Sequence, residues 1–230
     1  NMNNVISDIS LSARLIERDY PSKSVIMYQR WEELLFLHWS VEIGEVSKHL
    51  PPGLSVDTYD GMAWIGIVPF TMRGVRPRFL PSVLGLSNFP ELNLRTYVVD
   101  KRGRPGVWFF SLDTPKFLPN WIARTFFHLN YRLARMRVKT EESYRKYQSE
   151  LCSPSNLDQT QEYIWKRKGE SFLAAPSTLE FFLVERYRLF AYSRLKGQLL
   201  TGKVHHEPYT LQSVELMRYT KGLFDSNNLI

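Results

Sequence analysis

Two runs of alternating side chains near the middle of the chain constrain its fold more than any other feature. The runs are Glu91–Val99 (ELNLRTYVV) and Gly106–Asp113 (GVWFFSLD), and a short basic turn, DKRGRP, separates them. Alternation with a period of two is typical of strands, and a short turn rich in Gly and Pro joins antiparallel neighbours. The two runs therefore predict a hairpin that carries ionisable side chains among aliphatic and aromatic ones.

Short strand-like runs continue on both sides of this hairpin. They are separated by turn signals such as Asp60-Gly61 and by short helical patterns at Glu42–Leu50 and Thr178–Glu185. Many short strands at close spacing favour a barrel or a sandwich. We expect a mainly β (α+β) fold with a few short helices, in a single domain over residues 28–230. Residues 1–27 are expected to form an N-terminal arm or extension.

The remaining elements follow from the same patterns. Strands are expected at Trp31–Val41, Met62–Met72, Tyr131–Lys139, Glu162–Lys168, Arg186–Tyr192, Gln198–His205 and Thr210–Tyr219. A helix is expected at Pro119–His128. The segment Arg73–Pro90 contains several Pro and Gly residues, which predict a long irregular loop.

Composition narrows the classes of function. The formal net charge is +7, but no run of five or more Lys or Arg occurs, so nucleic-acid binding is not implied. The single cysteine, Cys152, excludes an internal disulfide and is typical of a reducing compartment. No segment approaches the roughly 20 apolar residues that cross a bilayer, and no signal peptide is evident. We expect a cytoplasmic protein that binds neither nucleic acid nor membrane.

No metal site is expected. His205 and His206 are adjacent on a predicted strand, so their side chains point to opposite faces. No other histidine stands at a spacing that supports a metal ligand set. The chain also lacks a Gly-rich phosphate loop and a nucleophile elbow. We therefore expect no cofactor.

The predicted hairpin has one polar face. Glu91, Asn93 and Arg95 alternate along the first strand, and pairing of Leu94 near Phe110 would gather the large aliphatic side chains on the other face. The expected polar face consists of Glu91, Asn93, Arg95, Ser111 and Asp113, with Tyr97 and Phe109 as walls. In a closed barrel such a face can line a cavity. The alternative is a structural ion-pair network without a ligand.

Several motifs resemble one known family. HLPPGLSVDTYDGMAWIGIVPFTM, SNFPELNLRTYV, GVWFFSLD, ARTFFHLNYRLARM and FFLVERYRLF with VHHEPY follow one another along the chain. Together they resemble the uncharacterised YqjF-like bacterial family, which is usually placed in the acetoacetate-decarboxylase-like superfamily. The resemblance covers about residues 28–219. It implies a large, curved antiparallel β-barrel of acetoacetate-decarboxylase-like type with an internal pocket.

The resemblance also bears on catalysis. The decarboxylase uses a Schiff-base lysine within a segment resembling R-E-L-x-x-Y-P-K-K-L-G. In the similar segment here, Arg124 falls on the arginine, Tyr131 on the reactive lysine and Arg132 on its cationic neighbour. Because tyrosine cannot form an imine, Schiff-base decarboxylase chemistry is not expected. Lys139 and Lys203 are candidates for a displaced amine, although lysines are far commoner on solvated strand edges.

Three functions remain open. The first is binding of a small anionic or carbonyl-bearing organic molecule in the barrel interior. The second is an enzyme of the same superfamily that acts without lysine and uses Glu91 or Asp113 as a general acid or base beside Tyr131. The third is a structural protein whose cavity is filled by its own side chains. The expected ligand-binding residues are Arg95, Arg124, Arg132, Ser111, Asn93, Trp108 and Phe109. Exposed edge strands would also permit a homo-oligomer.

Overall fold

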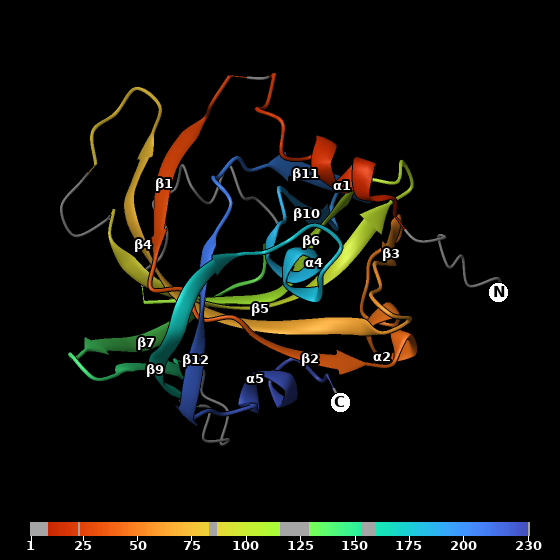
Figure 1. Ribbon diagram of the computed structural model, residues 1–230. Coiled ribbons are helices and arrows are strands. Elements are labelled where there is room, and N and C mark those ends of the chain that lie inside the picture. Colours follow the sequence, from red (N-terminus) through yellow and green to blue (C-terminus); the bar gives the residue numbers. More distant parts are fainter. Residues whose placement is uncertain (1–8, 23, 83–86, 116–128, 153–159, 230) are drawn as a thin grey trace.

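The computed structural model describes residues 9–22, 24–82, 87–115, 129–152 and 160–229 (Figure 1). The predicted helix at Pro119–His128 and the candidate Arg124 lie outside these residues. None of the described helices is long and apolar enough to cross a membrane.

The described strands form one large curled sheet (Figure 1). Its order is β1 (Met27–Glu32), β4 (Ala63–Pro77), β5 (Phe89–Asp100), β6 (Pro105–Thr114), β7 (Tyr131–Thr140), β8 (Arg145–Leu151), β9 (Thr160–Leu173) and β12 (Thr210–Arg218). Four shorter strands branch from it: β2 (Leu37–Val41) pairs with β4, β3 (Leu54–Val56) with β5, and β10 (Arg188–Ser193) with both β6 and β11 (Gln198–Lys203). Most pairs are antiparallel, but β6 runs parallel to β7 and to β10.

The described helices are short: α1 (Leu11–Ile16), α2 (Ile43–Ser47), α4 (Leu179–Val184) and α5 (Gly222–Asp225). Two of them begin at a side-chain cap, because the hydroxyl of Ser10 accepts from the N–H of Ala13 and the hydroxyl of Thr178 accepts from that of Phe181. The mainly β fold with a few short helices is thus confirmed.

Two predicted elements differ from the structure. The strand expected at Trp31–Val41 is interrupted, because Glu33 adopts a left-handed conformation (φ 54°) and its carboxylate pairs with Arg145 and Arg167. The long loop expected at Arg73–Pro90 is shorter. Here β1 pairs with β4 as far as Pro77, which extends β4 beyond the point where its Gly and Pro residues predict an end.

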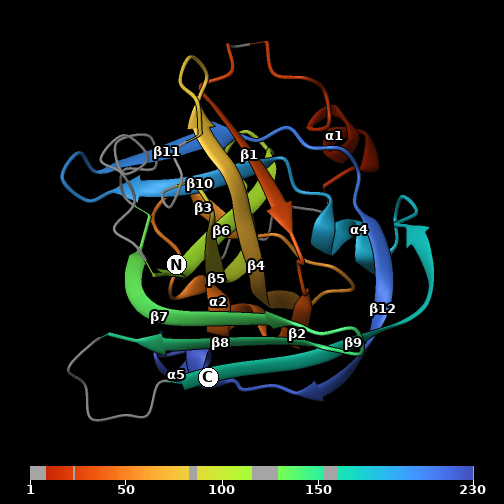
Figure 2. The same cartoon turned by 90° about the vertical axis from the view of Figure 1, so that its left-hand side faces the viewer.

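The largest hydrophobic cluster lies on one face of β4 and β5. Figure 2 shows β7, β8 and β9 running across these strands. Alternate residues of β4 and β5 pack there against side chains of β8, β9 and α5. The cluster includes Ile65, Ile67, Leu92, Leu94, Tyr147, Tyr163, Trp165 and Phe224. The opposite face of β4 and β5 is turned toward β1, α4 and β10, and it carries the candidate site.

The register of the β5–β6 hairpin differs from the expected one. Leu94 pairs with Ser111, and its neighbour Arg95 pairs with Phe109. Phe110 is therefore an extra residue on β6, which is the definition of a β-bulge. A bulge shifts the alternation of one strand by one residue, so side chains on either side of it no longer share a face.

This bulge separates residues that the sequence groups together. Beyond it, Ser111 and Asp113 lie on the core face, whereas Glu91, Asn93 and Arg95 lie on the opposite face. The prediction of a single polar face that contains all five residues is therefore wrong. The period-two pattern of β6 does not reveal the inserted residue.

Candidate functional site

A cavity of about 80 Å³ lies on the face of the sheet opposite the core. Its walls come from β1, β4, β5, β6, the start of β7 and the segment that follows α4. A buried water needs about 10–15 Å³ of such space. The cavity therefore has room for about six water-sized groups, which suits a molecule of a few non-hydrogen atoms.

The wall of this cavity holds buried polar atoms that have no hydrogen-bond partner in the part of the chain that the structure describes. They are Gln29 Oε1, Trp31 Nε1, Glu91 Oε2, Asn93 Oδ1, Arg95 Nε and Arg186 Nη2. A buried polar group without a partner costs about 1–3 kcal/mol. Six such groups around one cavity indicate that a polar molecule or ordered water satisfies them.

Arg95 is held in place by neutral groups. Its Nη2 donates to Tyr97 Oη (3.2 Å) and to the backbone oxygen of Leu183 (3.0 Å), and its guanidinium carbon lies 5.4 Å from the centre of the Phe36 ring. No carboxylate within ion-pair distance of Arg95 occurs among the described residues. Its charge is therefore available to an anion in the cavity.

His38 fixes the orientation of Tyr97. The His38 Nε2 and the Tyr97 hydroxyl are 2.6 Å apart. Burial, together with the charge of Arg95, lowers the pKa of His38 well below its ordinary value, so the imidazole is neutral at pH 7. Tyr97 Oη accepts from Arg95 and shares a second hydrogen bond with His38. These three side chains form a chain of hydrogen bonds that ends at Arg95 in the cavity wall.

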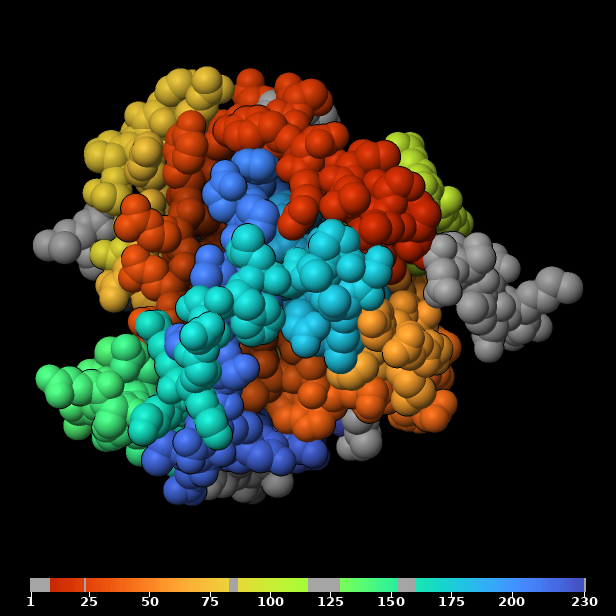
Figure 3. All heavy atoms as spheres, viewed as in Figure 1, coloured from red at the N-terminus to blue at the C-terminus, as the bar shows by residue number. Residues whose placement is uncertain are grey.

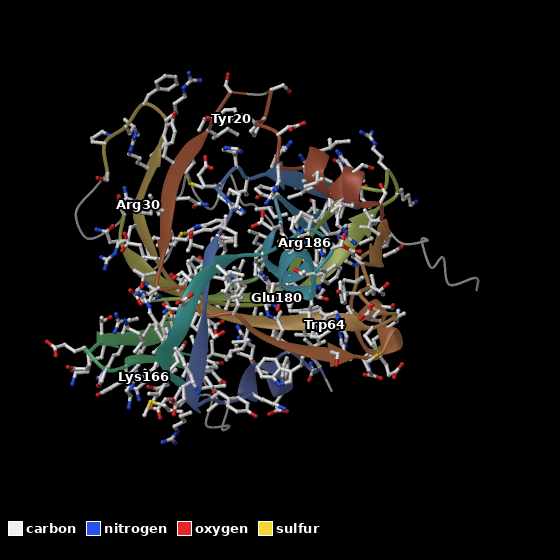
Figure 4. The ribbon with its side chains drawn as sticks, viewed as in Figure 1. Tyr20, Arg30, Trp64, Lys166, Glu180 and Arg186 are labelled. Atoms are coloured by element: carbon white, nitrogen blue, oxygen red, sulfur yellow. The ribbon has the colours of Figure 1, made fainter. Side chains whose placement is uncertain are left out.

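Arg186 follows α4 (Figure 4). Its side chain is almost fully buried. Its Nη1 donates to Asp57 Oδ2 (2.6 Å) and its Nε to the backbone oxygen of Phe182 (2.6 Å). Its Nη2 is buried without a partner among the described residues, and the Arg186 side chain lines the cavity. Asp57 also accepts two hydrogen bonds from Arg14 of α1 (2.7 and 2.8 Å). Burial alone would raise the pKa of Asp57, but Arg186 and Arg14 outweigh it and hold that pKa below its ordinary value.

The other end of the cavity contains an acid that is protonated at neutral pH. Burial raises the pKa of Glu91 to about 8, and the charge of Asp113 across the sheet adds to the shift. Tyr131 lines the same cavity, and burial and the charge of Glu91 raise its pKa well above the ordinary value. Both groups are therefore predominantly in their protonated forms at pH 7.

Three of the expected site residues form a separate cluster on the core face. Arg132 donates two hydrogen bonds to Asp113 (2.6 and 3.1 Å) and one to Ser226 (3.2 Å). Ser111 accepts from Asn227 (3.2 Å). This network ties β6 and β7 to the segment after α5, and none of these side chains lines the cavity.

The expected site residues thus separate into groups. Glu91, Asn93, Arg95, Phe109 and Tyr131 line the cavity. Ser111, Asp113 and Arg132 belong to the core-face network. Trp108 lines a second hollow beside Phe110, His49 and Asn130, and Phe109 borders both spaces. The functional roles assigned to these residues stay predictions.

Sequence patterns did not identify several cavity residues. Gln29, Trp31, Arg186 and Tyr209 come from segments far from the hairpin in the chain. For Arg186 a signal exists, because it follows the buried run Phe-Phe-Leu-Val of α4 after a single residue. A charged side chain so close to a buried run has to find a partner inside the protein.

In the described part of the chain, no group of three or more His, Cys, Asp or Glu residues is placed to hold a metal ion. His206 instead stacks on Tyr187, with ring centres 4.4 Å apart. Lys139 and Lys203, the candidate amines, do not line the cavity, and none of the described lining residues is a lysine.

Comparisons with known proteins agree with this architecture. Residues 28–230 match the DUF2071 family, which is described as an uncharacterized conserved protein. The chain is also 39% identical over 190 residues to the uncharacterized protein YqjF of Bacillus subtilis (strain 168), an alignment that covers 83% of this chain and 76% of that protein. The chain belongs to this family. The expected family relationship is confirmed.

Solved structures with a similar fold include two named enzymes. The enduracididine biosynthesis enzyme MppR has a TM-score of 0.61 at 12% identity, and the match covers 90% of this chain and 81% of MppR. An acetoacetate decarboxylase from Legionella pneumophila has a TM-score of 0.53 at 14% identity, with 94% and 84% covered. At these identities the likeness shows the fold, and it confirms the acetoacetate-decarboxylase-like architecture.

Proposed function

We propose that this family member binds a small organic anion in the 80 Å³ cavity, with Arg95 and Arg186 as the anion-binding groups. The observation that carries the proposal is that both side chains line the cavity, and that Arg95 Nε and Arg186 Nη2 are buried without a partner among the described residues. A hydrogen bond between a guanidinium and a carboxylate is one of the stronger interactions available in a protein. A bound carboxylate would accept hydrogen bonds from both N–H groups and would neutralise the charge of Arg95.

The surrounding charges support an anionic ligand. Around the cavity four arginines face two carboxylates: Arg14, Arg95, Arg186 and Arg188 against Glu17 and Asp57. The excess is positive, and Arg95 is the arginine without a carboxylate partner in the described chain. A small anion would reduce this excess, whereas a cation would increase it.

The far end of the cavity favours a carbonyl group on the same ligand. A protonated Glu91 is a hydrogen-bond donor, and Asn93 and Tyr131 lie on the same wall. The ligand of one structural neighbour is consistent with this chemistry, because MppR was solved with a condensation product of pyruvate and imidazole 4-carboxaldehyde. A short acid with a second oxygen, such as pyruvate, fits both ends.

Calorimetry with pyruvate and acetate, and with acetone and acetamide as uncharged counterparts, tests the proposal. We expect the acids to bind and the uncharged molecules to bind at least tenfold more weakly. The Arg95→Gln variant is expected to lose this preference. The matched control is Arg132→Gln, which removes a partly buried arginine that does not line the cavity. Equal binding of acids and uncharged molecules, or no loss in Arg95→Gln, would contradict the proposal.

A second candidate function is acid–base catalysis without a lysine, and the raised pKa of Glu91 beside Tyr131 favours it. Once deprotonated, a carboxylate with a pKa near the working pH is a competent general base. Asp113 lies on the core face, so only Glu91 of the two candidate carboxylates lines the cavity, which supports Glu91 as the base in this proposal.

Exchange of the methyl protons of pyruvate in D₂O, followed by NMR, separates catalysis from simple binding. We expect exchange to be faster with the protein than without it, and to return to the background rate in Glu91→Gln. Exchange at the background rate with the native protein would leave binding as the function. Treatment with acetoacetate and borohydride is expected to leave the protein mass unchanged. A stable adduct on a lysine would show that the protein does form an imine.

A further inference from the structure

The helix α1 lies in the segment that precedes the family match at residues 28–230, and this segment forms ion pairs with residues at the cavity wall and directly behind it. In Figure 3 the red spheres of the N-terminal segment lie against the cyan spheres around α4. Arg14 forms an ion pair with Asp57. Directly after the helix, Glu17 pairs with Arg188 and Arg18 pairs with Glu185. Arg188 lines the cavity, and Asp57 is the ion-pair partner of Arg186.

The carboxylate of Asp57 is divided between two arginines. Its Oδ1 accepts from Arg14 Nη2 (2.8 Å), and its Oδ2 accepts from both Arg14 Nη1 (2.7 Å) and Arg186 Nη1 (2.6 Å). Arg14 therefore has the two-point pair that a guanidinium and a carboxylate prefer. Arg186 has a single hydrogen bond to Asp57, and its second terminal nitrogen, Nη2, is buried without a partner among the described residues.

Without Arg14, both oxygens of Asp57 would be available to Arg186. A two-point pair between Arg186 and Asp57 would engage Nη2 and turn it away from the cavity. It would also neutralise the charge of Arg186 more completely, because Asp57 would no longer be shared. Both changes would weaken the binding of an anion by Arg186.

We propose that Arg14 is a positioning residue for the anion site: by occupying Asp57, it keeps Arg186 Nη2 available to the ligand. This inference rests on the proposed function. It assigns a role in ligand binding to a helix outside the matched domain. The helix acts through Asp57 and Arg186 and does not itself line the cavity.

Calorimetry with pyruvate tests the inference in four proteins: wild type, Arg14→Ala, Arg186→Gln and the double variant. We expect Arg14→Ala to lower the affinity for pyruvate about tenfold, which is the effect expected from losing one charge-assisted hydrogen bond. In the Arg186→Gln background the same change is expected to have no further effect, because the role of Arg14 runs through Arg186. An equal loss in both backgrounds would overturn the inference.

Arg18→Ala is the matched control. It removes another ion pair of the same segment, to Glu185, but leaves Asp57 untouched. We expect it to lower stability without changing the affinity for pyruvate. Arg14→Lys keeps a charge beside Asp57 and is expected to recover part of the affinity. It also serves as the folded variant where Arg14→Ala does not fold.

A crystal structure of the unliganded Arg14→Ala protein, or of Arg14→Lys in its place, gives a readout that needs no ligand. The inference predicts that Arg186 shifts toward a two-point contact with Asp57, fully in Arg14→Ala and partly in Arg14→Lys. An unchanged Arg186 with Nη2 at the cavity would overturn it, even if pyruvate binds the wild type. Failure of pyruvate and acetate to bind the wild type would instead overturn the proposed function and, with it, the role of Arg14 in ligand binding.

Discussion

Replacing Asp57 with alanine is expected to lower the free energy of unfolding by about 3–5 kcal/mol, which is typical when one partner of a buried ion pair is removed. The Asp57 side chain is only 2% exposed and that of Arg186 only 4%, so the substitution leaves a buried guanidinium without its counter-charge. Arg14 loses its two-point partner at the same time. Urea unfolding at neutral pH measures the difference.

Glu150→Ala is the control for Asp57→Ala. Glu150 pairs with Arg135 at 3.5 Å, but both side chains are more than half exposed, so a change within about 0.5 kcal/mol is expected. Because the pKa of Asp57 is lowered by folding, its contribution is present at neutral pH and is lost as the pH falls below about 4. A loss of less than about 1 kcal/mol in Asp57→Ala would contradict the described pairing.

Glu91→Gln is expected to make the protein more stable at alkaline pH. The pKa of Glu91 is raised from 4.5 to about 8 in the folded protein, so the folded state holds a proton that the unfolded state has released between these values. Stability of the wild type therefore falls as the pH rises from about 4.5 to about 8. One pKa unit corresponds to about 1.4 kcal/mol, so the total reaches several kcal/mol.

The variant lacks this titration and keeps a side chain of similar shape. Unfolding of the two proteins in urea at a series of pH values should give similar stabilities near pH 4.5 and a growing advantage for Glu91→Gln up to about pH 8. Glu150→Gln, which changes an exposed carboxylate, should follow the wild type at every pH. Parallel curves for wild type and Glu91→Gln would mean that Glu91 is ionised in the folded protein at neutral pH.

Local patterns in the sequence were sufficient to predict the class of fold. Strand alternation and turn residues are short-range properties, and the hairpin of β5 and β6 forms where they predict it. The same patterns failed at Phe110, because a bulge is set by how two strands twist and pack together. That single residue moved Ser111 and Asp113 to the core face.

The candidate site was only partly predictable for a similar reason. Glu91, Asn93 and Arg95 lie on one strand, so their common face follows from alternation. Arg186 gains its position from Asp57, which is 129 residues away in the chain, and Asp57 in turn binds Arg14, 43 residues away. Such long-range pairs leave no periodic signal in a single sequence. Tyr131 was identified through the family resemblance, and it does line the cavity.

The central claim is that the cavity beside Arg95 and Arg186 binds a small anion, and the most direct test is a crystal structure of the protein soaked in pyruvate. We predict density for the acid inside the cavity, with its carboxylate about 2.7–3.1 Å from Arg95 Nε and Arg186 Nη2 and its carbonyl directed toward Glu91. Ordered water alone in the cavity, or an acid bound only elsewhere on the surface, would contradict it.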